Sequence, residues 1–493
     1  MYPHAEAVER RVLFSRALPA GSALAFLQQP AELVVGERFA PVIAVGLQDS
    51  GGQLLTKSHA SVALSIGSGP DAGRILRRAS LIGGIATFRG VVFNLAGAYT
   101  LQASTGNVSS ASSSVITVDS TAPPSTIAWS GPLVITQGGT YSGNWQSLDP
   151  QMPAVTIATS QPVVIDQANI ESRSTLIATS VAGADITITN TSGWALNPGV
   201  VGQSPGRFLN AQNFVNVDIE HDSMVGTSGI ELSQYQGDGS MSQTVRVQYN
   251  DALNIDGRWS SGPRGFSMAP GRSDAVQFCQ LDRCTALRGA QIAWNRVVNI
   301  PGMSRVEDNI SIFQSSGTAG SPILIHDNLI QGAYPAQPPS PSFTGGGILL
   351  SDGHTDSAAT DTGFVQAFSN VVIGTTNYGI AISSGHDDSV HDNIVVSSGR
   401  LPDGTKLGAS NVGIYVWNAG NDPFFGNDQE YGNTIGWMRG NGRNDQYLPN
   451  VTPSSGQPSD TLLPGVITLA TEQMYENLWM QRLSNARLGV GAS

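Results

Sequence analysis

The densest charged features of this 493-residue chain are three short segments in its second half. They are residues 304–309 (Ser-Arg-Val-Glu-Asp-Asn), 352–356 (Asp-Gly-His-Thr-Asp) and 386–388 (His-Asp-Asp). Each segment comes directly before or after a short apolar run of the kind that forms a buried strand. If these runs are neighbouring strands, their carboxyl and imidazole groups can lie close together in space.

Paired carboxyl groups are what the hydrolysis of a glycosidic bond requires. One acts as the acid and the other as base or nucleophile, at a separation of about 5 to 9.5 Å. Stacked strands lie about 4.8 Å apart, so carboxylates on successive or alternate strands fall within that range. Glu307, Asp308 and Asp352 are therefore the leading acid/base candidates, and His354 or His386 could assist by hydrogen bonding.

Elimination from a uronate polymer makes different demands on the residues. A base removes the proton beside the uronate carboxylate, while cations neutralise that carboxylate. The chain has only two lysines, Lys57 and Lys406, and Lys406 lies in the loop-like segment LPDGTKLG. An elimination that uses arginine in place of lysine remains open, with Arg305, Arg264 and Arg272 as candidates. Arg305 is kept as a catalytic candidate. Hydrolysis is preferred because carboxylates are plentiful and lysine is scarce.

Polar and aromatic residues also follow one set of predicted strands. Aligning these strands on their apolar cores places one residue of each in an outward column: Glu231, Gln277, Ser311, Leu349, Ala381 and Tyr415. The residues at the strand exits are Gln234, Gln280, Gln314, Asp352, Ser384 and Asn418. Amides and carboxylates bind sugar hydroxyls, and rings such as those of Tyr415 and Trp417 cover apolar sugar faces. We take the predicted substrate-binding residues to be Glu231, Gln314, Tyr415, Trp417, Asn418 and His386. The alternative is that this row is the ordinary polar exterior of a solenoid.

The elements that would position these residues are short and repeated. Runs such as ILIHDNLIQG (323–332) and VQAFSNVVIG (365–374) alternate with runs such as GGILLSDG (346–353) and YGIAISSG (378–385). Buried parallel strands read as apolar runs of this kind. The sequence therefore predicts coils of parallel strands stacked along one axis.

Asparagines recur in the first kind of run at unequal distances. Asn328 and Asn370 are 42 residues apart, whereas Asn370 and Asn393 are 23 apart. Unequal spacing is typical of a solenoid whose coils carry insertions at one corner, since arrays of globular repeats keep their period. We expect these asparagines to face inward at a corner and to form a ladder from coil to coil.

These repeats, from about residue 127 to 450, resemble right-handed parallel β-helix proteins of the pectate-lyase-like type. That type includes polysaccharide lyases, glycoside hydrolases and non-catalytic surface proteins, so the resemblance implies a fold and no single reaction. The sequence departs from the catalytic patterns of its lyases and hydrolases, and no catalytic residue is transferred from them.

A different pattern fills residues 24–119. Apolar residues alternate over short runs such as 42–47 and 61–66, with turn clusters between them, which is typical of an antiparallel sandwich. The strings FLQQPAELVVGERFAPVIAVGLQDSGGQ and AGAYTLQAS resemble the Ig-like repeats of bacterial surface proteins. The resemblance implies a spacer or binding module without catalysis. The predicted architecture is all-β: an N-terminal segment (1–23), an Ig-like β-sandwich (24–119), a linker (120–126), a right-handed parallel β-helix (127–450) and a linker with a C-terminal helix (451–493).

The predicted C-terminal helix has a cap and an apolar face. Thr471 could cap it, and its apolar face would pack back on the solenoid. That face is formed by Met474, Tyr475, Leu478, Trp479 and Leu483. The two cysteines, Cys279 and Cys284, leave two alternatives open: a small disulfide loop, or two half-buried thiols in adjacent turns.

Composition limits the partners. The net charge is −12 and no basic run exists, so nucleic acid is an unexpected partner. No stretch approaches the roughly 18 apolar residues of a membrane span. The segment before residue 24 lacks the apolar core of a secretory signal. A secreted or cell-surface location is therefore inferred from the predicted domains, and the sequence leaves the oligomeric state open.

No cofactor is expected for this chain. Calcium is considered at Asp352, Asp356 and Asp361 or at Asp387 and Asp388. EF-hand spacing is absent, and aspartates in Gly-rich corners are commonly turn residues.

Two hypotheses follow. The first is an extracellular carbohydrate-active enzyme that cleaves a polysaccharide in a groove along the solenoid, by hydrolysis in preference to β-elimination. The second is a non-catalytic cell-surface, structural or adhesion protein that binds glycans or acts as a spacer. Convergence of Glu307, Asp308 and Asp352 beside Tyr415 and Trp417 would favour the first, and their scattering over different faces would favour the second.

Overall fold

The computed structural model divides into two compact units, residues 1–120 and 121–493, each described here by itself. The described residues are 21–27, 33–35, 39, 42–69, 72–93, 97–106, 108, 110–119, 122–263, 265–337, 340–341, 344–402 and 404–492. Most of the predicted N-terminal segment and Arg264, considered above for elimination, lie outside the described residues.

The first unit contains two sheets around one apolar core. The smaller sheet has the order β1 (Ala23–Phe26), β3 (Ile43–Gln48) and β6 (Ile85–Phe88). The larger has the order β2 (Leu33–Val34), β9 (Ile116–Asp119), β7 (Gly97–Ser104), β4 (Ser61–Ser68) and β5 (Ile75–Ser80), with β8 (Ala111–Ser112) beside β7. Neighbouring strands are antiparallel except β2 and β9. Val45, Leu64 and Leu101 are among the side chains of both sheets that share the core. The Ig-like assignment stays a prediction.

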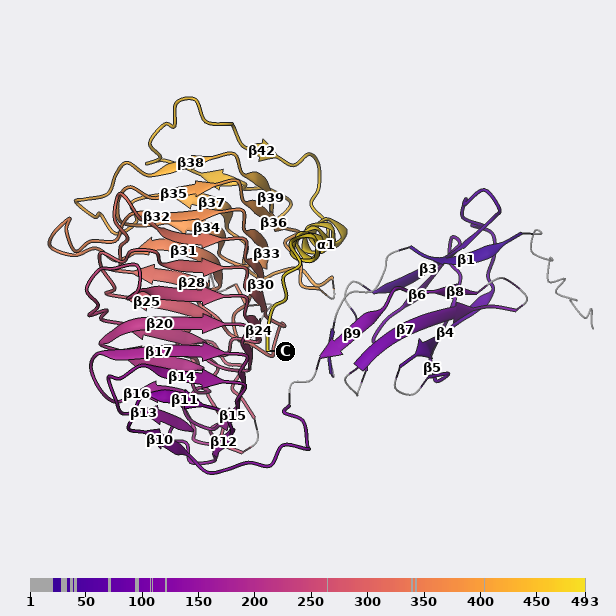
Figure 1. Ribbon diagram of the computed structural model, residues 1–493. Helices are drawn as coiled ribbons and strands as arrows, with labels where there is room; N and C mark the ends of the chain where they lie inside the picture. The colour runs from indigo at the N-terminus through magenta and orange to yellow at the C-terminus, as the bar shows by residue number, and fades with distance from the viewer. Residues whose placement is uncertain are drawn as a thin grey trace, which may run out of the picture. The chain divides into compact units, whose positions relative to one another are not determined.

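The second unit is a parallel β-helix of three sheets (Figure 1). Each coil contributes one strand to each sheet in turn. Sheet I consists of β10 (Leu133–Ile135), β13 (Val155–Ile157), β16 (Ile177–Thr179), β19 (Leu209–Gln212), β22 (Ile230–Ser233), β25 (Cys279–Asp282), β28 (Asp308–Phe313), β31 (Gly346–Asp352), β34 (Tyr378–Ile382), β37 (Val412–Val416) and β41 (Gln446–Tyr447).

Sheets II and III complete each coil. Sheet II consists of β11 (Gly139–Tyr141), β14 (Val163–Asp166), β17 (Ala184–Thr189), β20 (Phe214–Glu220), β23 (Val245–Gln248), β26 (Gln291–Ala293), β29 (Ile323–His326), β32 (Val365–Phe368), β35 (Ser389–His391) and β38 (Gln429–Tyr431). Sheet III consists of β12 (Asn144–Ser147), β15 (Asn169–Ser172), β18 (Ser192–Ala195), β21 (Ser223–Val225), β24 (Asp251–Leu253), β27 (Arg296–Val298), β30 (Leu329–Ala333), β33 (Val371–Thr375), β36 (Ile394–Ser397), β39 (Thr434–Arg439) and β40 (Gly442–Arg443), with β42 (Thr461–Leu462) paired to β39. The all-β fold with a parallel β-helix, predicted from the alternating runs, is confirmed.

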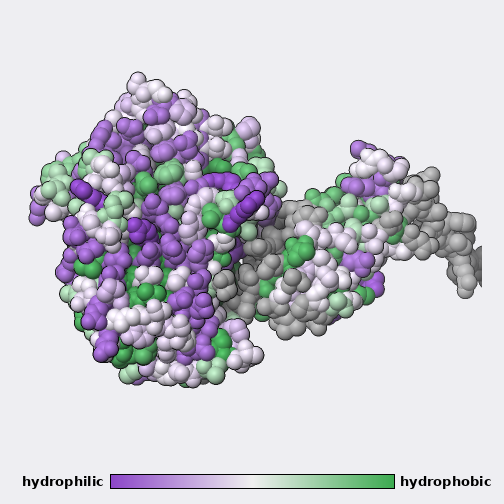
Figure 2. Space-filling model, viewed as in Figure 1, coloured by the Kyte–Doolittle hydropathy of each residue, from purple (hydrophilic) through white to green (hydrophobic). Residues whose placement is uncertain are grey.

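Apolar side chains fill the interior in columns that run from coil to coil. In sheet I the registered partners Ile310, Ile348, Ile380 and Ile414 all point inward and are fully buried. Burial of each such side chain stabilises the fold by about 1.5 to 3 kcal/mol relative to exposure. Because the side-chain period of a strand is two, the inward columns fix which residues face outward. The outer face of the unit seen in Figure 2 is predominantly hydrophilic, with scattered apolar side chains.

An asparagine ladder closes the tight turn between sheets II and III. In five successive steps an Asn side chain donates from Nδ2 to Oδ1 of the next Asn, at 2.9 to 3.0 Å. The ladder runs through Asn250, Asn295, Asn328, Asn370, Asn393 and Asn433. The residue before each one adopts a left-handed backbone conformation, which lets the chain turn within one or two residues. The predicted ladder is confirmed, including the unequal spacings of 42 and 23 residues.

One helix, α1 (Leu469–Ala486), packs beside β33 and β36 of sheet III (Figure 1). Its N-cap is Thr468 and not the predicted Thr471, which occupies the third helical position and completes a capping box. Trp479 is fully buried and donates from Nε1 to the carbonyl of Asp327 at 2.7 Å.

The predicted apolar face of α1 is correct only in part. Leu483 is buried, as predicted, but Met474 and Leu478 are exposed. Glu472 is buried instead, because its carboxylate accepts a hydrogen bond from the amide of Ser398 at 2.5 Å. In the part of the chain that the structure describes, no helix is both long and apolar enough to cross a membrane.

The two cysteines lie inside the β-helix. Cys279 and Cys284 are fully buried free thiols, so the disulfide alternative is wrong and the thiols are more buried than expected. Burial raises the pKa of both thiols, which keeps them protonated and apolar in the core.

Candidate functional site

The outer face of sheet I carries the residues that the sequence singled out. One outward column follows the register Glu231, Gln280, Ser311, Leu349, Ala381, Tyr415 and Tyr447 across successive strands. Gln277, predicted for this column, is wrong: Gln280 occupies the position, three residues later. The other predicted members share this register, although Ser311, Leu349 and Ala381 are buried. Gln280, predicted at a strand exit, lies inside β25, so that prediction is wrong.

Asp308 is the most enclosed of the three candidate carboxyl groups. It begins β28, is only 8% exposed, and accepts a hydrogen bond from the hydroxyl of Tyr378 at 2.5 Å. Gly346 lies between them on the intervening strand β31. A Cβ at Gly346 would come within 2.3 Å of Asp308 Oδ1 and 2.5 Å of the Tyr378 ring. The absence of a side chain at Gly346 therefore lets Tyr378 reach Asp308.

Asp352 owes its outward orientation to a bulge in β31. Pairing with β28 passes from Ser311 and Leu349 directly to Phe313 and Asp352, so β31 contains one extra residue. The same irregularity appears on the other side, where β31 pairs with β34. Because a one-residue shift moves side chains to the opposite face, the bulge brings Asp352 to the outer face beside Phe313.

The electrostatic environment couples these carboxyl groups. Burial raises the pKa of Asp308 to about 7, opposed by the Tyr378 hydrogen bond and reinforced by the charges of Glu307 and Asp352. Burial also raises the pKa of Glu307, where Arg305 opposes the shift and Asp352 adds to it. The pKa of Asp352 is raised by burial, against a backbone hydrogen bond from Gly353. The three groups therefore favour their protonated forms more than free carboxylates do.

Gln277 contacts Glu307, and Arg305 acts on it through its charge. Gln277 donates from Nε2 to Glu307 at 3.2 Å. Arg305 is 8% exposed and donates from Nη1 to the carbonyl of Asp274 at 2.6 Å. Burial lowers the pKa of Arg305, and the charges of Glu307 and Asp308 oppose that shift most strongly. Asp274 also accepts a hydrogen bond from the indole of Trp259 at 2.9 Å.

Aromatic rings continue from the carboxyl groups toward the C-terminal coils. Tyr378 and Tyr415 meet edge to face, with centroids 5.2 Å apart. Burial raises the pKa of Tyr415, and the charges of Asp308 and Asp352 add to that shift. Trp417 is 45% exposed, and its ring meets that of Tyr447 at 5.8 Å. Glu307, Asp308 and Asp352 thus lie close enough for their charges to act on one another, and Tyr415 feels the charges of Asp308 and Asp352. Trp417 follows directly after β37.

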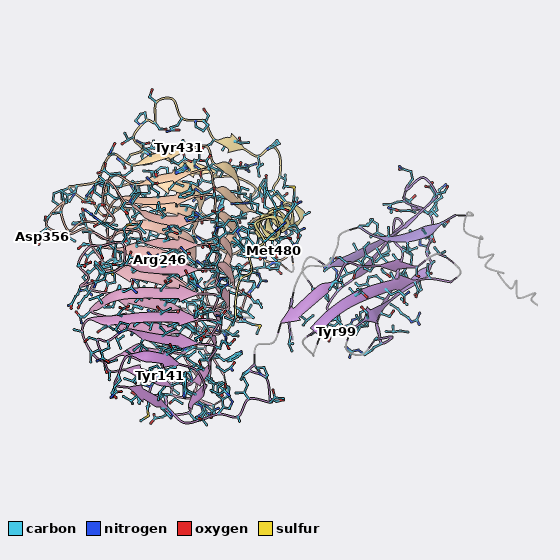
Figure 3. The ribbon with its side chains drawn as sticks, in the orientation of Figure 1. Tyr99, Tyr141, Arg246, Asp356, Tyr431 and Met480 are labelled. Atoms are coloured by element: carbon cyan, nitrogen blue, oxygen red, sulfur yellow. The ribbon has the colours of Figure 1, made fainter. Side chains whose placement is uncertain are left out.

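Four other predicted residues hold loops or partners of their own. Gln314 donates to the carbonyl of His354, whose exposed ring lies in the loop after β31. Figure 3 shows Asp356 at the outer end of that loop. The imidazole of His386 bonds to Asp387 at 2.8 Å and to the carbonyl of Ala358 in the same loop at 3.2 Å. Asn418 accepts from the amide of Asp422 and so closes a turn.

Glu231 stands apart, two strands before β28. It forms an ion pair with Arg207 at 2.7 Å. The arginine is held on the other side by the carbonyl of Ser228 at 3.0 Å. The predicted binding role of Glu231 is untested by this geometry.

Tyr378 is the residue that sequence reasoning missed. It begins the apolar run YGIAISSG, where a tyrosine reads as an ordinary strand residue. The signal that could have found it is its register: Tyr378 follows Gly346 and Asp308 in one column, and glycine in the middle leaves room for a ring.

Three of the five carboxylates considered for calcium, Asp361, Asp387 and Asp388, have protein partners. Asp361 accepts from the amide of Thr355 at 3.1 Å, and Asp388 accepts from the amide of Val365 at 2.8 Å. Asp387 pairs with His386. Among the described residues, no three His, Cys, Asp or Glu side chains are grouped so that they could hold a metal ion.

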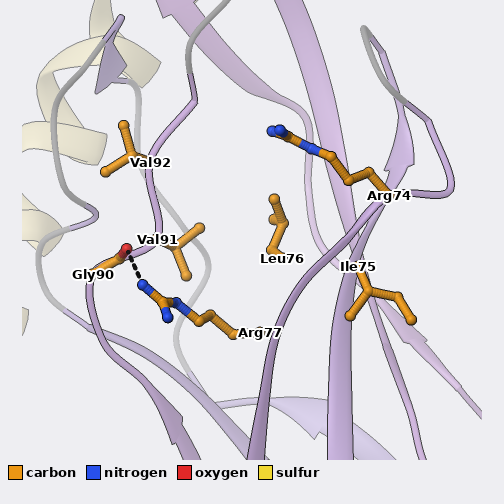
Figure 4. A pocket seen from close by; sticks show the side chains of 7 residues that line it. All are labelled: Arg74, Ile75, Leu76, Arg77, Gly90, Val91 and Val92. Atoms are coloured by element: carbon orange, nitrogen blue, oxygen red, sulfur yellow. Dashed lines mark hydrogen bonds between the residues drawn. The ribbon is translucent and has the colours of Figure 1, made fainter.

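A small pocket of about 200 Å³ lies in the first unit (Figure 4). It is lined by Arg74, Ile75, Leu76, Arg77, Gly90, Val91 and Val92. Arg77 donates to the carbonyl of Gly90 at 3.3 Å. Since the lining contains no carboxyl group, this pocket offers no acid–base pair.

Comparisons with known proteins give little beyond the geometry. No protein-family model matches the sequence, and curated proteins yield no match. Among solved structures, the chain is similar to a pectate lyase from Erwinia chrysanthemi in complex with tetragalacturonic acid. The identity is 10% and the TM-score 0.15, with 90% of this chain and 100% of that chain covered. A likeness at this level carries no argument about function.

Proposed function

We propose that the β-helix unit binds a polysaccharide along the outer face of sheet I and cleaves it by hydrolysis. The observation that carries the proposal is the carboxyl cluster of Glu307, Asp308 and Asp352, whose pKa values are all raised and whose charges act on one another. Pairs of carboxyl groups with different environments are what acid and base roles require.

Asp308 is suited to the role of general acid. With a pKa of about 7, it holds a proton through the mildly acidic to neutral range, unlike an ordinary aspartate. In the proposed step it donates that proton to the glycosidic oxygen as the bond to the anomeric carbon breaks. The ionised Asp308 is then stabilised by the hydroxyl of Tyr378.

Glu307 and Asp352 are the candidates for the second carboxylate. They belong to the neighbouring strands β28 and β31, with Glu307 directly before β28. Asp352 pairs with Phe313 at the far end of β28 and not with Asp308, but its charge acts on Glu307. A carboxyl separation of about 5 to 9.5 Å, as glycosidases use, is part of the proposal. One of them would activate a water molecule or attack the anomeric carbon directly. The charge of Arg305 would favour the ionised form of Glu307 and so opposes the rise in its pKa that burial causes.

Tyr415 and Trp417 would bind the sugar rings beyond the cleavage point. Tyr415 lies on β37 and Trp417 directly after it; β37 is three strands from β28 along sheet I, or about 14 Å at the ordinary strand spacing. Aromatic faces cover the apolar faces of sugars. We place the protein outside the cell or at its surface, where a polysaccharide would be met.

One observation favours a second candidate, glycan binding without cleavage. Tyr378 is 4% exposed and lies against Asp308, which is itself 8% exposed. A carboxyl group so covered can be a structural partner of the tyrosine. In that case Trp417 and Tyr447 would form the binding surface of a non-catalytic cell-surface protein.

An activity screen separates these candidates. The purified chain is incubated with neutral and uronate-containing polysaccharides, with and without EDTA, while reducing ends and the absorbance of unsaturated uronate are recorded. Hydrolysis predicts reducing ends without that absorbance and no effect of EDTA. The Asp308→Asn variant, isosteric and unable to donate as an acid, controls for contaminating activity and should lose about 100-fold or more in rate. Both signals together would establish elimination, and silence with glycan binding would establish the second candidate.

A further inference from the structure

Cations are scarce around the carboxyl cluster. Among the described residues, Arg305 is the guanidinium whose charge acts on Glu307 and Asp308. The interactions that set the pKa of Asp352 include no cation. Three carboxyl groups therefore share the field of one guanidinium on this part of sheet I.

Three guanidinium groups of these coils are already engaged, whereas Arg272 is exposed and lies over the Trp259 ring. Arg305 is buried and donates to the carbonyl of Asp274. Arg207, three coils earlier, pairs with Glu231. Arg258, in the insertion before β25, pairs with Asp256 at 2.8 Å and also donates to the carbonyl of Met303.

The rest of the face offers neutral groups. In the outward column Gln280 offers an amide, whereas Ser311, Leu349 and Ala381 are buried and offer no charge. Tyr415, Tyr447 and Trp417 follow with aromatic rings. Hydroxyl-rich, uncharged sugars match such a surface, because amides bind hydroxyls and rings cover C–H faces.

We propose that the substrate of this face is an uncharged glycan and that a uronate polymer is rejected. The inference rests on the proposed function, since it assumes that the glycan lies along sheet I. A uronate carboxylate placed beside Glu307, Asp308 and Asp352 would add like charge in a partly desolvated site. Arg305, the guanidinium whose charge acts on Glu307 and Asp308 among the described residues, is already bound to the carbonyl of Asp274 and is not free for the bidentate contact that carboxylates favour. Neutral sugars incur no such repulsion.

A pair of glycans that differ only in charge tests this directly. One is a neutral homoglycan with primary hydroxyl groups, and the other is the same polymer oxidised at C6 to the carboxylate. Binding to the full chain is measured by affinity electrophoresis at pH 7 across a panel of such pairs, and products are analysed in parallel. We expect at least one neutral member to bind, and its oxidised partner to bind at least 10-fold more weakly. The difference should shrink at high salt, where exposed charges are screened.

A second measurement uses a variant that adds a positive charge, with a matched control. Gln280→Arg adds a guanidinium to the outward column of sheet I, whereas Gln366→Arg makes the same change on β32 of sheet II. Binding of the oxidised glycan should rise at least several-fold in the first variant and stay at the wild-type level in the second.

The outcomes separate the two levels of the proposal. Neutral-glycan binding without cleavage would overturn hydrolysis and support the uncharged-substrate inference. Cleavage of a uronate polymer, or equal binding of both members of a pair, would overturn the inference and leave a glycan-cleaving function standing. Failure of every glycan to bind would overturn both.

Discussion

Replacing Tyr378 with phenylalanine removes one hydroxyl group from the site and leaves the ring. That hydroxyl donates to Asp308 at 2.5 Å and lowers the pKa of the carboxyl against the effect of burial. A hydrogen bond to a charged group stabilises it by about 1.5 to 3 kcal/mol, which corresponds to about one to two pH units. In Tyr378→Phe we therefore expect the pKa of Asp308 to rise from about 7 to roughly 8 or 9.

Thermal stability as a function of pH measures this shift without any substrate. The folded-state pKa of Asp308 exceeds its ordinary value, so its stabilising contribution is full below about pH 4 and is lost as the pH rises to about 7. The total loss is on the order of 4 kcal/mol, at 1.36 kcal/mol per unit. The difference between the wild type and Asp308→Asn isolates this contribution. In the Tyr378→Phe background the loss should continue to about pH 8 or 9.

Tyr415→Phe is the matched control for that experiment. Tyr415 lies against Tyr378 on the same face, but its hydroxyl bonds to Ser383 and not to Asp308. Its removal should leave the upper end of the pH window where the wild type has it. If the window ends at the same pH in Tyr378→Phe as in the wild type, the Tyr378 hydrogen bond does not control the ionisation of Asp308, and the reasoning is refuted.

Three further predictions concern the ladder, the glycine and the aromatic surface. Asn328→Ala should lower the free energy of unfolding of the β-helix by about 3 to 5 kcal/mol. The reason is that buried polar groups of Asn295, Asn370 and Ile292 lose their hydrogen-bond partner. A loss below about 1 kcal/mol in chemical denaturation would contradict this. Gly346→Ala should displace the Tyr378 ring and reproduce the raised pKa of Asp308 in the same pH series, whereas Gly320→Ala, where a Cβ meets nothing within 4 Å, should have no effect. Trp417→Ala should weaken glycan binding about 10-fold in calorimetry with an unchanged melting temperature, since the ring is 45% exposed; unchanged affinity would remove it from the binding surface.

Much of the β-helix could be predicted because its strands and tight turns are each marked by short stretches of sequence. Apolar runs of two alternating kinds are the sequence form of strands buried on one side of a coil, and Asn328, Asn370 and Asn393 mark the same tight turn in successive coils. Two histidines lie just before this turn, where His326 and His391 each bond to the following aspartate at 2.9 Å. Both also stack on Phe368 of the intervening strand.

The register of a strand was harder to predict where two neighbouring triplets show the same alternation of apolar and polar residues. Val276-Gln277-Phe278 and Cys279-Gln280-Leu281 both read apolar, polar, apolar, and only pairing with the neighbouring strands selects the second. The bulge in β31 is likewise set by both neighbouring strands. Asp352 could be nominated for its charge, but its orientation depends on a shift that the string GGILLSDG does not reveal.

The partnership of Asp308 with Tyr378 lay beyond sequence reasoning for a similar reason. The two residues are 70 positions apart and meet only because Gly346 separates them without a side chain. In the C-terminal helix the sequence predicted too apolar a buried face. Its apolar residues predicted an apolar face, yet Glu472 is buried because it can bind the amide of Ser398, a partner 74 positions away.

The crystal structure of the Asp308→Asn variant with a bound glycan oligomer tests the central claim most directly. The account predicts an oligosaccharide along the outer face of sheet I, with one ring against Trp417 and a glycosidic oxygen within hydrogen-bond reach of the substituted side chain at position 308. An oligosaccharide bound to sheet II, to sheet III or to the first unit, with the sheet I face empty, would contradict it.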